Sequence, residues 1–189
     1  MDGCLDDTYL IIKEDHDNML KSTGIKDPKR DKGCMYALIF CWQQQATTFN
    51  KTIDPYRKQI FIDAMIPNVN NKLFYRGIHI SKDRGGMELY DINKFDFVST
   101  TNNVDVAIDF AYGYKNSFKD KSNCYIAILT SDKMIDVNYY FDDLEEDEYI
   151  LYKPKLLGYI KLNEENERLV RQLDIESLLT KIKENKIIR

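Results

Sequence analysis

The chain has few of the residues that build disulfide frameworks and metal centres. Its 189 residues include only four cysteines and two histidines. Cys34 and Cys41 fall on one expected helix, roughly 10 Å apart along its axis, which is too far for a disulfide. No cysteine pair has the spacing of metal ligands, and only His16 and His79 could assist. The sequence therefore predicts free, mostly buried thiols and no metal site.

The chain also lacks an apolar run long enough to span a membrane. Its first seven residues, 1–7, are acidic, whereas a secretory signal has a basic start followed by an apolar stretch. These two features predict a cytoplasmic protein, of the producing or of a host cell, with no membrane partner.

Glycine and proline are too sparse to form a linker, and no internal repeat divides the chain. A length of 189 residues with 43% hydrophobic and 31% charged residues is typical of one globular domain. The net charge of −4 argues against a general binder of phosphate backbones, although local basic patches are possible.

The order of expected elements predicts an α+β fold. Residues 1–33 read as a polar lead-in and 34–68 as helical, with apolar spacing from Met35 and a second helix starting at Asp54-Pro55. The segment 73–162 reads as a β core containing one short helix, which Asn102 or Asn103 can cap. Its strands are expected at 73–80, 95–99, 124–129, 134–137, 148–151 and 156–162, and a single C-terminal helix at 164–189.

Arg76 is the first of three polar signals placed in apolar, β-prone runs, where burial is costly without a partner or ligand. Alternation puts Arg76 on the face of Phe74, Ile78 and Ile80. A guanidinium there can clamp a phosphate, and Gly77 beside it can let a ligand approach the backbone. A buried ion pair or an edge arginine is the structural alternative.

The second and third signals are a hydroxyl cluster and a pair of carboxylates. Ser99-Thr100-Thr101 stands at a strand end, where hydroxyl residues also serve as helix caps. Glu146 and Glu148 are two apart at the start of a strand, so alternation predicts that both project to one face. A solvated acidic loop is the alternative for this run of charges.

In this order the three signals resemble the Arg–Ser–Glu class of mono-ADP-ribosyltransferases, which includes clostridial and cholera-like toxins, vertebrate ecto-transferases and phage and viral relatives. The segments that carry the resemblance are Phe74-Tyr75-Arg76-Gly77, Phe97-Val98-Ser99-Thr100-Thr101 and Glu146-Asp147-Glu148. The family usually has serine where this chain has Thr101. The resemblance implies a split β-sandwich with flanking helices.

The resemblance also implies that NAD⁺ is the co-substrate and that no metal is required. Glu148 would stabilise the oxocarbenium-like transition state, Ser99 would hold Glu148, and Arg76 would bind the diphosphate or orient the nicotinamide ribose. Phe110 matches an aromatic residue that stacks on nicotinamide in relatives, although ordinary helix core is an equal alternative. Glu146 would receive the acceptor, a protein arginine, since a glutamate at this position accompanies arginine acceptors in the family.

Three alternatives remain open at this stage. An NAD glycohydrolase would use the same residues with water in place of the acceptor, and a degenerate copy would bind NAD⁺ or a protein without catalysis. A nucleic-acid acceptor is the third. A glycosidase fits less well, because two carboxylates on one strand do not flank a bond from opposite faces.

Overall fold

The computed structural model describes residues 32–44, 55–80, 92–113, 122–141 and 147–184. These residues fall into two compact units. One unit contains the described residues before Pro67 together with 135–141, and the other contains the remaining described residues. The expected turn at 84–86 and residues 1–31 of the expected lead-in 1–33 lie outside the described residues.

The first unit contains the helices α2 (Lys32–Gln44) and α4 (Pro55–Asp63). Met35, Leu38, Ile39 and Trp42 of α2 are buried, which confirms the apolar face predicted from their spacing. Pro55 is the first residue of α4, where its fixed φ suits a helix start and its missing N–H costs nothing. Helix α4 ends at Asp63, and Ile66–Pro67 forms the short strand β1.

Seven strands form one sheet in the order β1-β5-β6-β3-β2-β4-β7. After β1 they are β2 (Phe74–His79), β3 (Phe97–Thr101), β4 (Cys124–Thr130), β5 (Lys133–Asp136), β6 (Glu148–Tyr152) and β7 (Lys155–Lys161). The pairings of β2 with β3, β2 with β4, β3 with β6 and β4 with β7 are antiparallel. The α+β class predicted from the sequence is therefore confirmed.

The sheet is weakly joined at its middle. Strands β2 and β4 pair over six residues and β3 and β6 over five, but β2 and β3 share the single pair Tyr75↔Thr101. Strand β3 follows the 3₁₀ turn η4 (Ile92–Lys94), so the expected strand start at Phe95 is two residues early. We call β2–β4 and β3–β6 the two ladders of the sheet. One buried apolar cluster contains side chains from both ladders, including Phe74, Ile78 and Ala127 of the first and Val98, Tyr149 and Leu151 of the second.

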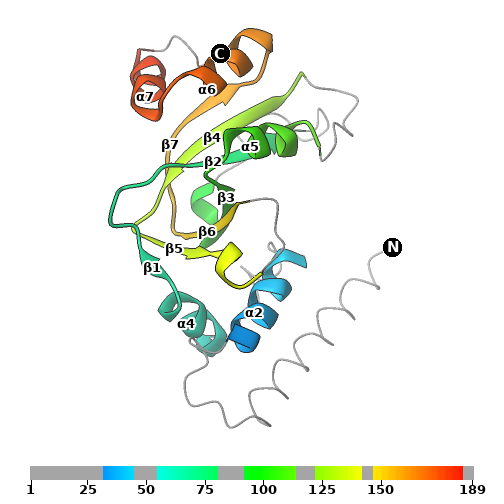
Figure 1. Cartoon of the computed structure of the whole chain (residues 1–189), viewed down its shortest axis with the longest axis vertical. Coiled ribbons are helices and arrows are strands. Elements are labelled where there is room, and N and C mark those ends of the chain that lie inside the picture. Colours follow the sequence, from blue (N-terminus) through cyan, green and yellow to red (C-terminus); the bar gives the residue numbers. More distant parts are fainter. Residues whose placement is uncertain (1–31, 45–54, 81–91, 114–121, 142–146, 185–189) are drawn as a thin grey trace. The chain divides into compact units, whose positions relative to one another are not determined.

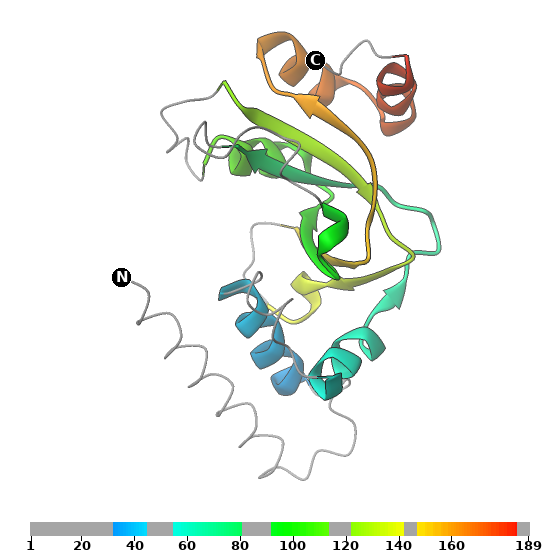
Figure 2. The same ribbon diagram turned by 180° about the vertical axis from the view of Figure 1, so that it is seen from behind.

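The other face of β2, β4 and β7 is covered by helices. These are α5 (Val104–Ala111) and the C-terminal helices α6 (Glu164–Gln172) and α7 (Ile175–Lys183), which lie next to these strands in Figures 1 and 2. Their buried side chains form one cluster with the strands, namely Tyr75, Ala107, Ile108, Ala111, Cys124, Ile126, Ile128, Ile160, Leu162, Val170, Leu178 and Ile182. Cys124 in this cluster is a free, buried thiol, as predicted.

The expectation of one C-terminal helix is wrong. Leu173 ends α6 in an extended conformation, and Asp174 caps α7 by accepting a hydrogen bond from the Ser177 amide. An aspartate that binds the backbone N–H groups beyond it favours a new helix start over continuation. None of the described helices has the length and apolar character needed to cross a membrane.

Candidate functional site

Arg76 lies on β2, at the point where the two ladders separate. Its Nη1 donates a hydrogen bond of 2.6 Å to the backbone carbonyl oxygen of Ser99 on β3. Strand β2 stands between β3 and β4 in the sheet, so the alternative of an edge arginine is wrong. Arg76 therefore links the two ladders directly beside their single pair, Tyr75↔Thr101.

Ser99 also contacts Glu148, the first residue of β6. The Ser99 hydroxyl donates to Glu148 Oε1 at 2.7 Å, as the resemblance implies. Register explains the contact: Glu148 pairs with Thr101 and Ser99 with Ile150, so Ser99 and Glu148 are diagonal neighbours on one face. The carboxylate is held in place, because Glu148 is only 7% exposed.

The hydroxyls of Thr100 and Thr101 are engaged with the backbone. Thr100 Oγ1 donates to the carbonyl oxygen of Tyr149, and Thr101 Oγ1 accepts from the amide of Asn103. Asn103 is the N-cap of α5, with its side chain accepting from the Asp105 amide. The Thr101 hydroxyl thus shapes the junction between β3 and α5, next to the cap residue, whereas the Thr100 hydroxyl joins β3 to β6.

Gly77 has a different role from the one expected. A Cβ at this position would lie 2.0 Å from the Ala107 carbonyl oxygen and 2.5 Å from the Ala111 amide nitrogen. The space beside Gly77 is therefore filled by the backbone of α5. The absence of a side chain allows a close approach to β2, but the approaching group is a helix and not the ligand that the sequence predicted.

Phe110 projects from α5 beside this contact. The Cβ of Phe110 lies 3.0 Å from the position of the added Gly77 Cβ, yet 44% of the residue is exposed. Its neighbours Ala107, Ile108 and Ala111 are buried against the sheet. The alternative of ordinary helix core is therefore wrong for Phe110. The ring is an exposed apolar surface next to Arg76-Gly77.

The reason for expecting Glu146 and Glu148 on one face of the strand does not hold in the structure. Alternation requires an extended residue between them, but Asp147 has φ 43°, in the left-handed region. Glu146 itself lies outside the described residues. Asp147 is exposed whereas Glu148 is buried, so the carboxylates of Asp147 and Glu148 lie in different surroundings.

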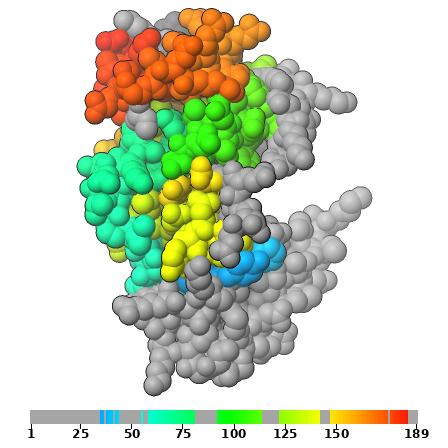
Figure 3. All heavy atoms as spheres, viewed as in Figure 1, coloured from blue at the N-terminus to red at the C-terminus, as the bar shows by residue number. Residues whose placement is uncertain are grey.

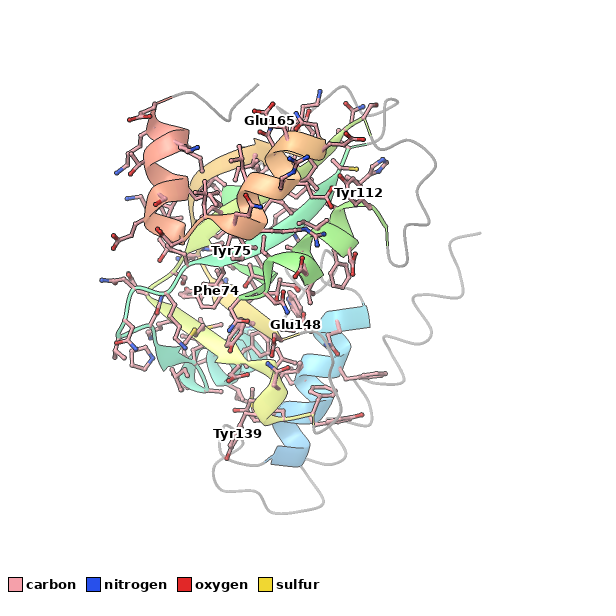
Figure 4. All side chains as sticks on the ribbon, turned by 45° about the horizontal axis from the view of Figure 1, so that its top comes forward. Phe74, Tyr75, Tyr112, Tyr139, Glu148 and Glu165 are labelled. Carbon is pink, nitrogen blue, oxygen red and sulfur yellow. The ribbon has the colours of Figure 1, made fainter. Side chains whose placement is uncertain are left out.

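Two aromatic residues beside the site were not found from the sequence. Tyr149, next to Glu148, packs its ring 5.1 Å from that of Phe74, and its hydroxyl accepts from Asn102 Nδ2 at 3.4 Å. Tyr75 lies opposite Thr101, and burial raises its pKa, so it remains neutral. Only the register between β2, β3 and β6 places Tyr75 and Tyr149 beside the strands of Ser99 and Glu148. Tyr75 and Glu148 are labelled in Figure 4.

The described residues contain no group of three or more His, Cys, Asp or Glu side chains able to hold a metal ion. Comparisons with models of known families, with curated proteins and with solved structures found no match. The site must therefore be interpreted from its own geometry and from the resemblance of its motifs.

Proposed function

We propose that this protein is an NAD⁺-dependent mono-ADP-ribosyltransferase of the Arg–Ser–Glu class, with protein arginine as acceptor. The observation that supports this most is the hydrogen bond between Ser99 and the buried carboxylate of Glu148. The same serine accepts from Arg76 through its carbonyl oxygen. Three residues from three strands, selected on motif order alone, thus form one connected chain.

The fold offers a second line of support. Two antiparallel ladders joined by a single pair, and sharing one apolar cluster, suit a split β-sandwich. The substrate would then bind where the ladders separate, beside Arg76 and Ser99. The exposed ring of Phe110 on α5 is available to stack against the nicotinamide cation.

The proposed reaction breaks the bond between the nicotinamide nitrogen and C1′ of the ribose. The bonding electron pair stays with nicotinamide, which leaves as a neutral molecule. Positive charge develops on the ribose, and the Glu148 carboxylate stabilises it through the 2′-hydroxyl. An arginine nitrogen then bonds to C1′ and loses a proton to Glu146, the base that the motif assigns.

Radiolabelled NAD⁺ offered with and without an arginine-rich protein tests this proposal. Wild type should release nicotinamide and label the acceptor. Glu148→Gln should lower both activities by about 100- to 1,000-fold, since a preorganised electrostatic group is lost while the amide oxygen still accepts from Ser99. The matched control is Glu165→Gln on an exposed position of α6, labelled in Figure 4, which should leave both activities unchanged.

Glu146→Gln separates transfer from hydrolysis. Labelling of the arginine-rich protein should disappear, while nicotinamide release persists at a substantial fraction of wild type. Release without any labelling in wild type would identify an NAD glycohydrolase. Labelling that survives in Glu146→Gln would point to another acceptor, including nucleic acid. No nicotinamide release by wild type would overturn the proposed activity.

A further inference from the structure

Helix α5 contacts the candidate site through Ala107, Phe110 and Ala111, which lie next to Gly77. The backbone at Ala107 and Ala111 lies directly on Gly77, beside Arg76, and the exposed ring of Phe110 projects from the same turn. Any shift of α5 along β2 therefore moves Phe110 relative to Arg76. The buried side chains of α5 are apolar, and apolar contacts are not directional. Directional polar contacts can add to this packing in fixing where the short helix lies.

A polar network connects both ends of α5 to α6. Arg171 of α6 pairs through Nη1 with Asp105, in the first turn of α5, at 2.9 Å. Its Nη2 contacts Glu167 Oε1 at 3.0 Å. The other oxygen of Glu167 accepts from the hydroxyl of Tyr112, the C-cap of α5, at 2.9 Å. The adjoining surfaces of α5 and α6 are green and orange in Figure 3.

This network matters for the position of α5 more than for the stability of the fold. The Arg171–Asp105 pair is exposed, with side chains 44% and 60% accessible, so its contribution to stability is small. Each bond is nonetheless directional, and the two ends of α5 are held by one bifunctional pair on α6. Burial and the hydrogen bond to Glu167 raise the pKa of Tyr112, so its hydroxyl remains a donor at neutral pH.

We propose that Tyr112, Glu167 and Arg171 are positioning residues that hold α5 so that Phe110 meets the nicotinamide ring of NAD⁺. This inference rests on the proposed function. The three residues act through Phe110 and not on the reacting bond, because the Ser99–Glu148 contact lies on β3 and β6. Loss of the network should therefore weaken NAD⁺ binding and leave turnover intact.

The test compares Tyr112→Phe and Arg171→Gln with Arg168→Gln, which removes the same charge from an exposed position of α6. NAD⁺ hydrolysis kinetics should show KM raised about fivefold in the first two variants, the effect of one ordinary hydrogen bond. Their kcat should stay within about twofold of wild type, and Arg168→Gln should match wild type. In a Phe110→Ala background, Tyr112→Phe should raise KM no further, since the residue it positions is gone.

The outcomes are distinguishable. An unchanged KM in Tyr112→Phe and Arg171→Gln, or a further rise in the Phe110→Ala background, would overturn the positioning role. Wild type without NAD⁺ turnover would overturn the proposed function and the assignment to nicotinamide. Hydrogen exchange of the α5 amides, measured without nucleotide, would then test whether the network holds α5 in place. Faster exchange in both variants but not in Arg168→Gln supports the network, and equal exchange in all three contradicts it.

Discussion

Ser99 uses its two oxygen atoms for two different purposes. Its carbonyl oxygen, on the backbone of β3, accepts from Arg76 and so joins the ladders where their pairing stops. Its hydroxyl fixes the carboxylate of Glu148. The two contacts are coupled, because displacement of β3 by loss of the first would also move the second. At the scale of single residues, Arg76 therefore has the structural role of joining β2 to β3, besides any contact with a phosphate.

Arg76→Lys tests this double duty. Lysine keeps the charge but replaces the planar guanidinium with a single ammonium, so it cannot bind a phosphate and the Ser99 carbonyl in the same geometry. We expect kcat/KM for NAD⁺ to fall about tenfold or more, with kcat and KM both affected. The measurement is steady-state nicotinamide release, with Arg168→Lys on the surface of α6 as control. Wild-type kinetics in Arg76→Lys would contradict both duties.

Gly77→Ala tests the contact between β2 and α5. The new Cβ would meet backbone atoms of Ala107 and Ala111, which move only if the whole helix moves. We expect a loss of about 1 to 3 kcal/mol in the free energy of unfolding, or more. Gly158→Ala is the matched control, because its nearest atoms belong to the flexible side chain of Ile182. Urea unfolding measures both, and equal losses would contradict the backbone clash.

At the scale of elements, the C-terminal segment shows how one residue divides a helix. Three apolar residues in the segment predicted as a single helix are buried in the structure, namely Val170, Leu178 and Ile182. They reach the sheet from two helices, because Asp174 binds the Ser177 amide and hydroxyl and starts a new one. These hydrogen bonds lower the pKa of Asp174, since they favour its charged form.

The lowered pKa sets the pH dependence of α7. The ionised carboxylate stabilises the fold above the ordinary pKa of 3.8, and this contribution is lost as pH falls through the lower pKa of the folded state. Asp174→Ala should therefore lower the urea midpoint at neutral pH, with a smaller difference from wild type at about pH 3. Asn is also a good cap, so Asp174→Asn isolates the charge. A difference that is constant with pH would contradict the assignment.

At the scale of the whole molecule, all described residues of the candidate site belong to the unit that contains β2, β3, α5 and β6. The other unit, with α2 and α4, contains the buried side chains of Trp42 and Phe61. A ligand that binds only the native site slows local opening of the elements it contacts.

Hydrogen exchange with and without NAD⁺ tests this location. Amides of β2, β3, β6 and α5 should exchange more slowly when NAD⁺ is bound, while those of α2 and α4 should not change. Phe110→Ala should weaken the protection at a fixed NAD⁺ concentration, because its affinity falls. Uniform protection of both units, or protection confined to α2 and α4, would place the binding site elsewhere.

The sequence determined what depends on neighbours along the chain. Alternation located the strands that contain Arg76, Ser99 and Glu148, helical spacing located the buried faces of α2 and α5, and Asn103 was identified as a possible cap. The resemblance that the three motifs carry also implied that Ser99 would hold Glu148. Such features follow from periodicities of about two and 3.6 residues and from hydrogen bonds between near neighbours.

Only the tertiary structure decided what depends on contacts distant in sequence. In the structure α5 packs on Gly77 and Phe110 is exposed. Helix α5 also contacts α6 through the hydrogen bond between Tyr112 and Glu167, which are 55 residues apart in the chain. The structure also has a left-handed residue at Asp147, where alternation assumed an extended one. Strand register and helix packing set these positions, and both are fixed by the burial of side chains from distant segments, which local periodicity does not encode.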